Sequence, residues 1–172
     1  MRYHHMLPHI LRHSELVANV ALLIARELNR HGQNLDLALV EAGALLHDIA
    51  KTLCLDTKEN HAHSGGDLVR ALGYPSVADI VRQHICLDPG VLASDGVTEA
   101  ALVNYADKRV KHEEVVGIEE RFRDVKERYI DKFPLFAERF MEIFFETQVL
   151  EKKIFSLIDI YPEDINDMFP SR

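Results

Sequence analysis

Apolar residues recur at helical spacing along nearly the whole of this 172-residue chain. Leu16, Val20 and Leu23, for example, fall on one face of a helix between residues 10 and 30. Alternating β-branched residues between tight turns would indicate strands, and the sequence contains no such run. The pattern therefore predicts an all-α fold. The predicted helices cover residues 10–30, 36–52, 62–72, 75–86, 98–111, 117–131 and 135–158.

Histidine and aspartate interrupt the apolar stripes of four of these helices. A buried carboxylate without a partner costs several kcal/mol, and few lysines or arginines share the stripes. Because four helices repeat the same violation, we expect one shared site in which a divalent cation satisfies these side chains together. The residues on the stripes are His13, His47, Asp48, His84 and Asp107, and His61 and His63 stand at the start of the helix predicted over 62–72.

The adjacent pair His47 and Asp48 is the most informative part of this pattern. Adjacent residues of a helix diverge by about 100°. Both side chains can nevertheless reach one ion lying against the helix, or the carboxylate can bridge two ions. An imidazole-rich ligand set favours Fe, Mn, Co, Ni or Zn over a magnesium site made only of oxygens. These residues are compatible with either one or two bound ions.

Several segments resemble the H…HD…D signature of the HD-domain (HDIG-type) metal-dependent phosphohydrolases. They are RHSELVANVA with His13, LLHDIAK with His47 and Asp48, and NYADKRV with Asp107. The intervening HAHSGGDLVRALGYP and VADIVRQH resemble the H-x-x-x-G-A and later histidine segments of the same family. The resemblance covers about residues 10–110. Within the family, these segments are similar to those of the bacterial subgroup that hydrolyses dinucleoside tetraphosphates with two irons. It implies a compact HD-domain helical bundle.

This resemblance also implies a ligand set. The first metal would be held by His13, His47, Asp48 and Asp107, and Asp48 would bridge to a second metal held by His61 and His84. Gly65 aligns with the family's glycine, which selects His61 over His63 as the ligand, while Gly66 stands where alanine is usual. Two roles remain open for His63. It would support the ligands from behind, or it would replace His61 as the ligand.

The reaction implied is hydrolysis of a phosphate ester or anhydride, in a nucleotide, by attack of metal-bound hydroxide. Asp48 and Lys51 are the expected catalytic residues, since the lysine at this position faces the phosphate in the resembled family. The alternative for Lys51 is a solvated side chain at a helix C-terminus. Lys108 and Arg109 follow Asp107 and are further candidates for phosphate binding.

Two other functions use a similar arrangement of residues. HD-type di-iron oxygenases cleave C–C or C–P bonds with O₂ and need the full two-metal site. A non-catalytic sensor would bind a nucleotide and report through the C-terminal helices, although every ligand position is filled here. Oxygen consumption distinguishes the first from a hydrolase, and tight nucleotide binding without turnover distinguishes the second.

The chain is expected to form one compact unit. We assign residues 1–112 to the HD domain, 113–160 to C-terminal helices packing on the same domain, and 161–172 to a loose acidic tail. The sequences CLDTKEN and LDPGVLASDG are expected to be loops. Phenylalanines 133, 136, 140, 144 and 145 form a packing face, either in the core or in the contact of a homodimer.

Net charge and hydropathy restrict the partners. The formal net charge of -8 argues against broad binding to nucleic acid or anionic lipid. No apolar run approaches the ~18–20 residues of a membrane span, and the N-terminus lacks the pattern of a signal peptide. We therefore expect a cytoplasmic protein whose partner is a phosphate-bearing small molecule, with no nucleic acid and no membrane.

Overall fold

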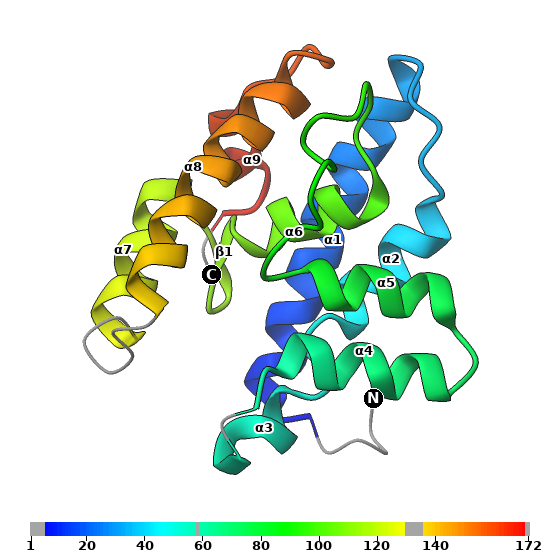
Figure 1. The fold of residues 1–172 in the computed structure, drawn as a ribbon. Helices are drawn as coiled ribbons and strands as arrows, with labels where there is room; N and C mark the ends of the chain where they lie inside the picture. Colours follow the sequence, from blue (N-terminus) through cyan, green and yellow to red (C-terminus); the bar gives the residue numbers. More distant parts are fainter. Residues whose placement is uncertain (1–5, 58, 130–135, 171–172) are drawn as a thin grey trace.

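The computed structural model describes residues 6–57, 59–129 and 136–170. These residues are helical nearly throughout, which confirms the all-α prediction (Figure 1). A short antiparallel hairpin of β1 (Val110–Lys111) and β2 (Glu114–Val115) lies between α6 and α7. The helices are α1 (Pro8–Arg30), α2 (Leu37–Leu46), α3 (Lys51–Thr57), α4 (His61–Ala71), α5 (Pro75–Gln83), α6 (Glu99–Asp107), α7 (Ile118–Tyr129), α8 (Phe136–Phe155) and α9 (Pro162–Met168).

The first helix is the central element of the bundle. It packs chiefly against α2 and α6, and its inward face is fully buried at Val17, Val20, Ile24 and Leu28. Small residues such as Ala21 lie on the same face and let the neighbouring helices approach. Because burying apolar surface stabilises by about 25 cal/mol per Å², this face fixes α1 relative to its neighbours. His13 lies on the same helix, one turn before Val17.

The helix predicted over residues 36–52 is interrupted. Asp36 caps its start as expected, because its Oδ1 accepts hydrogen bonds from the amides of Ala38 at 2.9 Å and Leu39 at 3.1 Å. The chain then turns over residues 47–50 through i→i+3 bonds, and α3 begins at Lys51. The loop predicted for CLDTKEN was therefore wrong at its start, since α3 continues to Thr57. His47 and Asp48 lie at this junction.

Helices α4 and α5 form an antiparallel pair, side by side in Figure 1. Asn60 caps the start of α4, since its Oδ1 accepts from the amide of Ala62 at 3.0 Å. A Cβ at Gly66 would lie 2.1 Å from Cγ of Arg82 and 3.1 Å from the carbonyl oxygen of Ala78, so glycine permits this close approach. Because the helices are antiparallel, the beginning of α4 adjoins the end of α5.

The hairpin replaces the last turn of the helix predicted over residues 98–111. Helix α6 ends at Asp107, and Val110 pairs with Val115 across the two strands. His112 lies between the strands with a φ of 55°, the left-handed conformation that a tight hairpin turn requires. The sequence contains neither glycine nor an Asn-Gly pair at this turn, so the usual hairpin signal was missing.

Helix α9 contradicts the prediction of a loose tail for residues 162–168. Ile165 on this helix is fully buried. The Arg109 guanidinium, from the end of α6, donates to the carbonyl of Pro162 at 2.9 Å and to Oδ1 of Asn166 at 2.6 Å. An apolar residue within the acidic sequence and a buried arginine far away in the chain together hold this segment in place.

The phenylalanine face is partly internal. Phe122 of α7 lies 5.3 Å from Phe140 and 5.0 Å from Phe144 of α8, measured between ring centroids. Phe145 is 58% exposed, and its role in a homodimer stays a prediction. Phe133 lies outside the described residues. Within the described ranges, no helix combines the length and apolarity needed to cross a bilayer.

Candidate metal centre

Six side chains from five parts of the chain meet inside the bundle as two groups of three. In each group the nitrogen and oxygen atoms that could bind a cation lie within 4.8 Å of one another. The sequence predicted that these six would share one site, and the structure brings them together. The first group consists of His13, His47 and Asp107, and the second of Asp48, His61 and His84.

The first group joins α1, the end of α2 and the end of α6. Oδ1 of Asp107 lies 3.0 Å from Nε2 of His13 and 3.6 Å from Nε2 of His47. Both imidazoles are buried, with His47 fully so. Asp107 is the last residue of α6, and its carboxylate lies between His13 of α1 and His47 at the end of α2.

The second group is built on the antiparallel pair. His61 opens α4 and His84 follows α5, so their Nε2 atoms lie 3.2 Å apart. Oδ1 of Asp48 lies 3.1 Å from Nε2 of His61 and 3.6 Å from Nε2 of His84. Oδ2 of the same carboxylate lies 3.5 Å from Nε2 of His47, so Asp48 faces both groups.

Backbone carbonyls orient three of the imidazoles. Nδ1 of His47 lies 2.7 Å from the carbonyl oxygen of Ala44, and Nδ1 of His84 lies 2.7 Å from that of Val81. Nδ1 of His13 lies 3.0 Å from the carbonyl oxygen of His112 in the hairpin. Because a carbonyl only accepts hydrogen bonds, Nδ1 of each of these imidazoles carries a proton, and Nε2 faces the centre, where it can hold either a second proton or a cation.

Two buried atoms of the centre lack a hydrogen-bond partner among the described residues. They are Nε2 of His47 and Oδ1 of Asp48. Buried polar atoms are nearly always satisfied, since an unsatisfied one costs about 1–3 kcal/mol. A cation bound by both atoms would satisfy them. The mixture of imidazole nitrogens and carboxylate oxygens fits a divalent transition metal.

The charges of the centre also fit a cation. Burial alone would raise the pKa of Asp48 and of Asp107. The charges of His47 and Lys51 hold the pKa of Asp48 well below its usual value, and His13 and His47 do the same for Asp107. Burial lowers the pKa of His84 to about 3, with a further contribution from the charge of His47. His84 is therefore a neutral imidazole facing ionised carboxylates, as a metal ligand must be.

His47 carries a proton in the metal-free protein. Burial lowers its pKa, but the charges of Asp48 and Asp107 outweigh burial and raise the pKa to about 10. A proton on His47 supplies the positive charge that the two carboxylates require. Because a cation bound at the same nitrogen would supply that charge instead, metal and proton compete for this position.

Lys51 lies beside the centre as expected. Its Nζ is 2.6 Å from Oδ2 of Asp48, and its side chain is 33% exposed. Burial lowers the pKa of Lys51, but the charge of Asp48 outweighs it and the pKa is raised. The lysine is thus charged, bound to the carboxylate that faces both groups, and accessible from solvent.

Lys108 and Arg109 do not fit the phosphate-binding role predicted for them. Nζ of Lys108 donates to the carbonyl of His84 at 2.9 Å and to that of Asn104 at 3.2 Å, which satisfies the end of α5. Arg109 is 1% exposed and donates to Tyr105, Val116, Pro162 and Asn166. The geometry disfavours both predictions because both side chains are buried and donate to partners inside the protein.

Two residues refine the ligand set. His63 is exposed and belongs to neither group, so the geometry favours His61 of the two alternatives. Asn104, which the sequence analysis missed, donates to the carbonyls of Gln83 at 2.7 Å and His84 at 3.1 Å. It fixes the end of α5 beside the ligand His84. A buried asparagine on an apolar helix three residues before Asp107 was the available signal.

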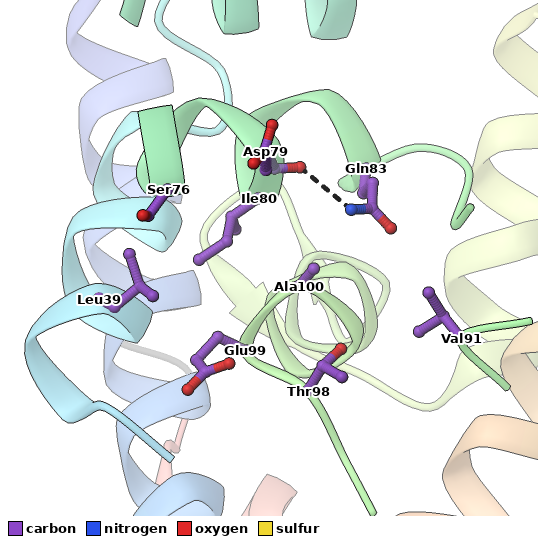
Figure 2. A pocket seen from close by; sticks show the side chains of 9 residues that line it. All are labelled: Leu39, Ser76, Asp79, Ile80, Gln83, Val91, Thr98, Glu99 and Ala100. Carbon is purple, nitrogen blue, oxygen red and sulfur yellow. Dashed lines mark hydrogen bonds between the residues drawn. The ribbon is translucent and has the colours of Figure 1, made fainter. Parts of the chain in front are cut away.

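A pocket of about 270 Å³ lies elsewhere, between α2, α5 and α6 (Figure 2). None of the six ligand residues lines it. Asp79 and Gln83 contribute polar atoms, and the amide of Gln83 donates to the carbonyl of Asp79 at 3.4 Å. This pocket is therefore separate from the candidate metal centre.

A family model described as HD domain matches residues 10–161. The chain is also similar to proteins named ribonuclease Y. Identity to that of Treponema pallidum (strain Nichols) is 29% over 134 residues, covering 70% of this chain and 25% of the relative. Identity to that of Treponema denticola is 40% over 76 residues, covering 44% of this chain and 14% of the relative. Identity to that of Thermus thermophilus is 37% over 76 residues, covering 44% of this chain and 12% of the relative.

These comparisons differ in how much of each protein they cover. The family match includes the hairpin, α7 and α8, which lie beyond the residues that carry the resemblance in the sequence. The chain spans only a quarter or less of the length of the three ribonuclease Y relatives. No solved structure matches the chain significantly.

Proposed function

This chain belongs to the HD-domain family, and on that basis we propose that it is a metal-dependent phosphohydrolase that cleaves a phosphate ester or anhydride of a nucleotide. The family expected from the sequence is thereby confirmed. The relatives are named ribonuclease Y, so they do not support the narrower likeness to dinucleoside-tetraphosphate hydrolases. The nucleotide substrate and the identity of the metal are part of the proposal.

The position of Asp48 carries the proposal. Its Oδ1 faces His61 and its Oδ2 faces His47, so one carboxylate connects the two ligand groups. Paired cations that share a carboxylate act together on the attacking and leaving oxygens of an in-line displacement at phosphorus. The ligand chemistry suits one or two ions of Fe, Mn, Co, Ni or Zn.

The residues of the chain divide the work of the reaction. A bound divalent cation lowers the pKa of water and stabilises the charge on phosphoryl oxygens. Asp48 is ionised because its pKa is lowered, and its carboxylate would orient a cation bound between the two groups. Lys51 fixes Oδ2 of Asp48 and presents a positive charge to solvent, which would attract and position a phosphate. We therefore assign catalytic roles to Asp48 and Lys51.

A phosphodiester of RNA is the second candidate substrate, because the relatives are named ribonuclease Y. These relatives are much longer than the region that aligns with this chain, since the alignment with the Treponema pallidum protein covers 25% of that protein. The net charge of -8 disfavours binding along an extended phosphate backbone. We therefore place a phosphate-bearing small molecule first and nucleic acid second.

The test is hydrolysis by protein loaded separately with Mn, Fe, Co or Ni. The substrates are a panel of nucleotides, dinucleoside polyphosphates and short RNA oligonucleotides. Release of phosphate or nucleoside monophosphate from the small molecules, abolished in Asp48→Ala, supports the proposal. Cleavage of RNA alone would favour the second candidate. Oxygen consumption by the iron-loaded protein, or tight nucleotide binding without turnover, would overturn hydrolysis in favour of an oxygenase or a sensor.

A further inference from the structure

Arg121 lies on α7, beyond the residues that carry the family resemblance, and its side chain is only 12% exposed. Its terminal nitrogen lies 3.3 Å from Oδ2 of Asp124, one turn further along the helix. Its Nε is buried and has no hydrogen-bond partner among the residues that the structure describes. A guanidinium in this state has been removed from water while one of its donors remains available.

Three contacts connect Arg121 to the metal centre. Asp124 holds Arg121 through Oδ2, and its Oδ1 lies 3.6 Å from Nε2 of His112. The carbonyl of His112 in turn lies 3.0 Å from Nδ1 of the ligand His13. Figure 1 shows α7 beside the hairpin that carries His112. The hairpin thus ties the first turns of α7 to the first ligand group.

The positive charge of Arg121 contributes to the pKa values of Asp107 and Lys51. Burial raises the pKa of Asp107, hydrogen bonds from His13 and His47 lower it, and the positive charge of Arg121 lowers it further. Arg121 also acts on Lys51, whose pKa is set mainly by burial and by Asp48. This direction agrees with the contacts through Asp124 and His112 that connect α7 to the first ligand group.

The alternative is that Arg121 only stabilises α7 through its ion pair with Asp124, and two observations argue against this. Asp124 pairs with Arg128 as well as with Arg121, so it is not dedicated to Arg121. A structural arginine normally has its buried donors satisfied, as Arg109 does through four partners. Arg121 instead keeps Nε without a described partner near the two groups of histidines and aspartates, which is the arrangement expected of a residue that binds an anion.

We propose that Arg121 binds the phosphoryl oxygens of the substrate at the metal centre, together with Lys51. The planar guanidinium offers several donors in a fixed fork that matches phosphate geometry, whereas Lys51 acts as a point charge. Asp124 holds the guanidinium in place. This inference rests on the proposed phosphohydrolase function and adds a substrate-binding residue to it.

The experiment compares Arg121→Ala and Arg121→Lys with Arg123→Ala in metal-loaded protein. Arg123 is exposed on the same helix, so its removal changes the net charge equally. We expect Arg121→Ala to weaken binding of inorganic phosphate, and to lower kcat/KM, by about tenfold to a hundredfold. Arg121→Lys should recover only part of this loss. Metal content should stay at the wild-type value, and added guanidinium should partly rescue Arg121→Ala.

The binding measurement separates this inference from the proposed function. If the wild-type protein hydrolyses no phosphate substrate, the proposed function fails, and phosphate affinity still decides the role of Arg121. Unchanged phosphate affinity in Arg121→Ala would overturn the inference. Loss of bound metal in the folded Arg121→Lys protein would also overturn it, since Arg121 would then support the ligands rather than the substrate. If Arg121→Ala does not fold, weaker phosphate binding by folded Arg121→Lys at full metal content supports the inference.

Discussion

Nε2 of His61 lies 3.2 Å from Nε2 of His84, where the beginning of α4 adjoins the end of α5. Nδ1 of His84 is committed to the carbonyl of Val81, so Nε2 of His84 presents a lone pair. Nε2 of His61 can donate a hydrogen bond to it, or both nitrogens can bind one cation. The antiparallel pair thus creates a position that a cation can occupy.

Replacement of His61 should therefore differ from replacement of His63. His61→Ala removes one of three ligands of the second group, and we expect at least a tenfold to hundredfold loss of metal affinity there. His63→Ala, two residues away on the exposed side of α4, should leave metal binding unchanged. Metal stoichiometry and titration of both purified variants check this. Equal losses, or a loss confined to His63→Ala, would mean that the ligand of α4 is wrongly assigned.

Metal affinity should rise with pH. The charges of Asp48 and Asp107 raise the pKa of His47 to about 10, so binding at its Nε2 displaces a proton. Apparent affinity should increase by up to about tenfold per pH unit below pH 10 and level off above it. Calorimetry in buffers of different ionisation enthalpy measures the released proton. Affinity that is independent of pH over this range would show that His47 is not protonated in the metal-free protein.

The stability of the metal-free protein should change in the opposite direction. Its His47 has a pKa above the unfolded value of 6.5, so the contribution of that proton to stability is fully present below pH 6.5. It is lost as pH rises toward 10. Urea unfolding of wild type and of His47→Gln, both without metal, isolates this contribution. The difference between them should shrink as pH rises, and a constant difference would contradict the assignment.

Gly43 should be sensitive to substitution because α2 and α5 pack closely there. A Cβ at Gly43 would lie 2.6 Å from Cγ2 and 3.1 Å from Cβ of Ile80, a stiff side chain in the core. We expect Gly43→Ala to destabilise the protein by about 1–3 kcal/mol. The control is Gly117→Ala, since a Cβ there would meet its nearest atom at 3.8 Å. Chemical denaturation of both variants makes the comparison, and equal stability would refute the packing argument.

The bundle and the clustering of the candidate ligand residues could be predicted from the sequence, because both follow from helical spacing. Helical spacing identified α1 and α5, and His13 and His84 stood out as polar residues on apolar faces. The break between His47 and Lys51 could not be read in this way, since Ile49 and Ala50 continue an acceptable helical pattern. Local i→i+3 hydrogen bonds there are selected by tertiary packing.

The positively charged residues near the centre were the hardest to assign from the sequence. Lys108 and Arg109 were assigned from their position next to Asp107, but each residue rotates about 100° around the helix axis, so neighbours in sequence face different surroundings. Arg121 stands at helical spacing with Ile118, Phe122 and Val125, but it was missed because α7 lies beyond the residues that carry the family resemblance. The hairpin at His112 links α7 to the centre, and the sequence did not predict that hairpin.

The claim that a cation binds between the two ligand groups is tested most directly by crystallography of the metal-loaded protein, with anomalous diffraction at the absorption edge of the bound metal. We expect one or two anomalous peaks within bonding distance of Oδ1 or Oδ2 of Asp48 and of Nε2 of His47. Peaks elsewhere on the molecule, or catalytically active crystals without a peak at Asp48, would contradict it.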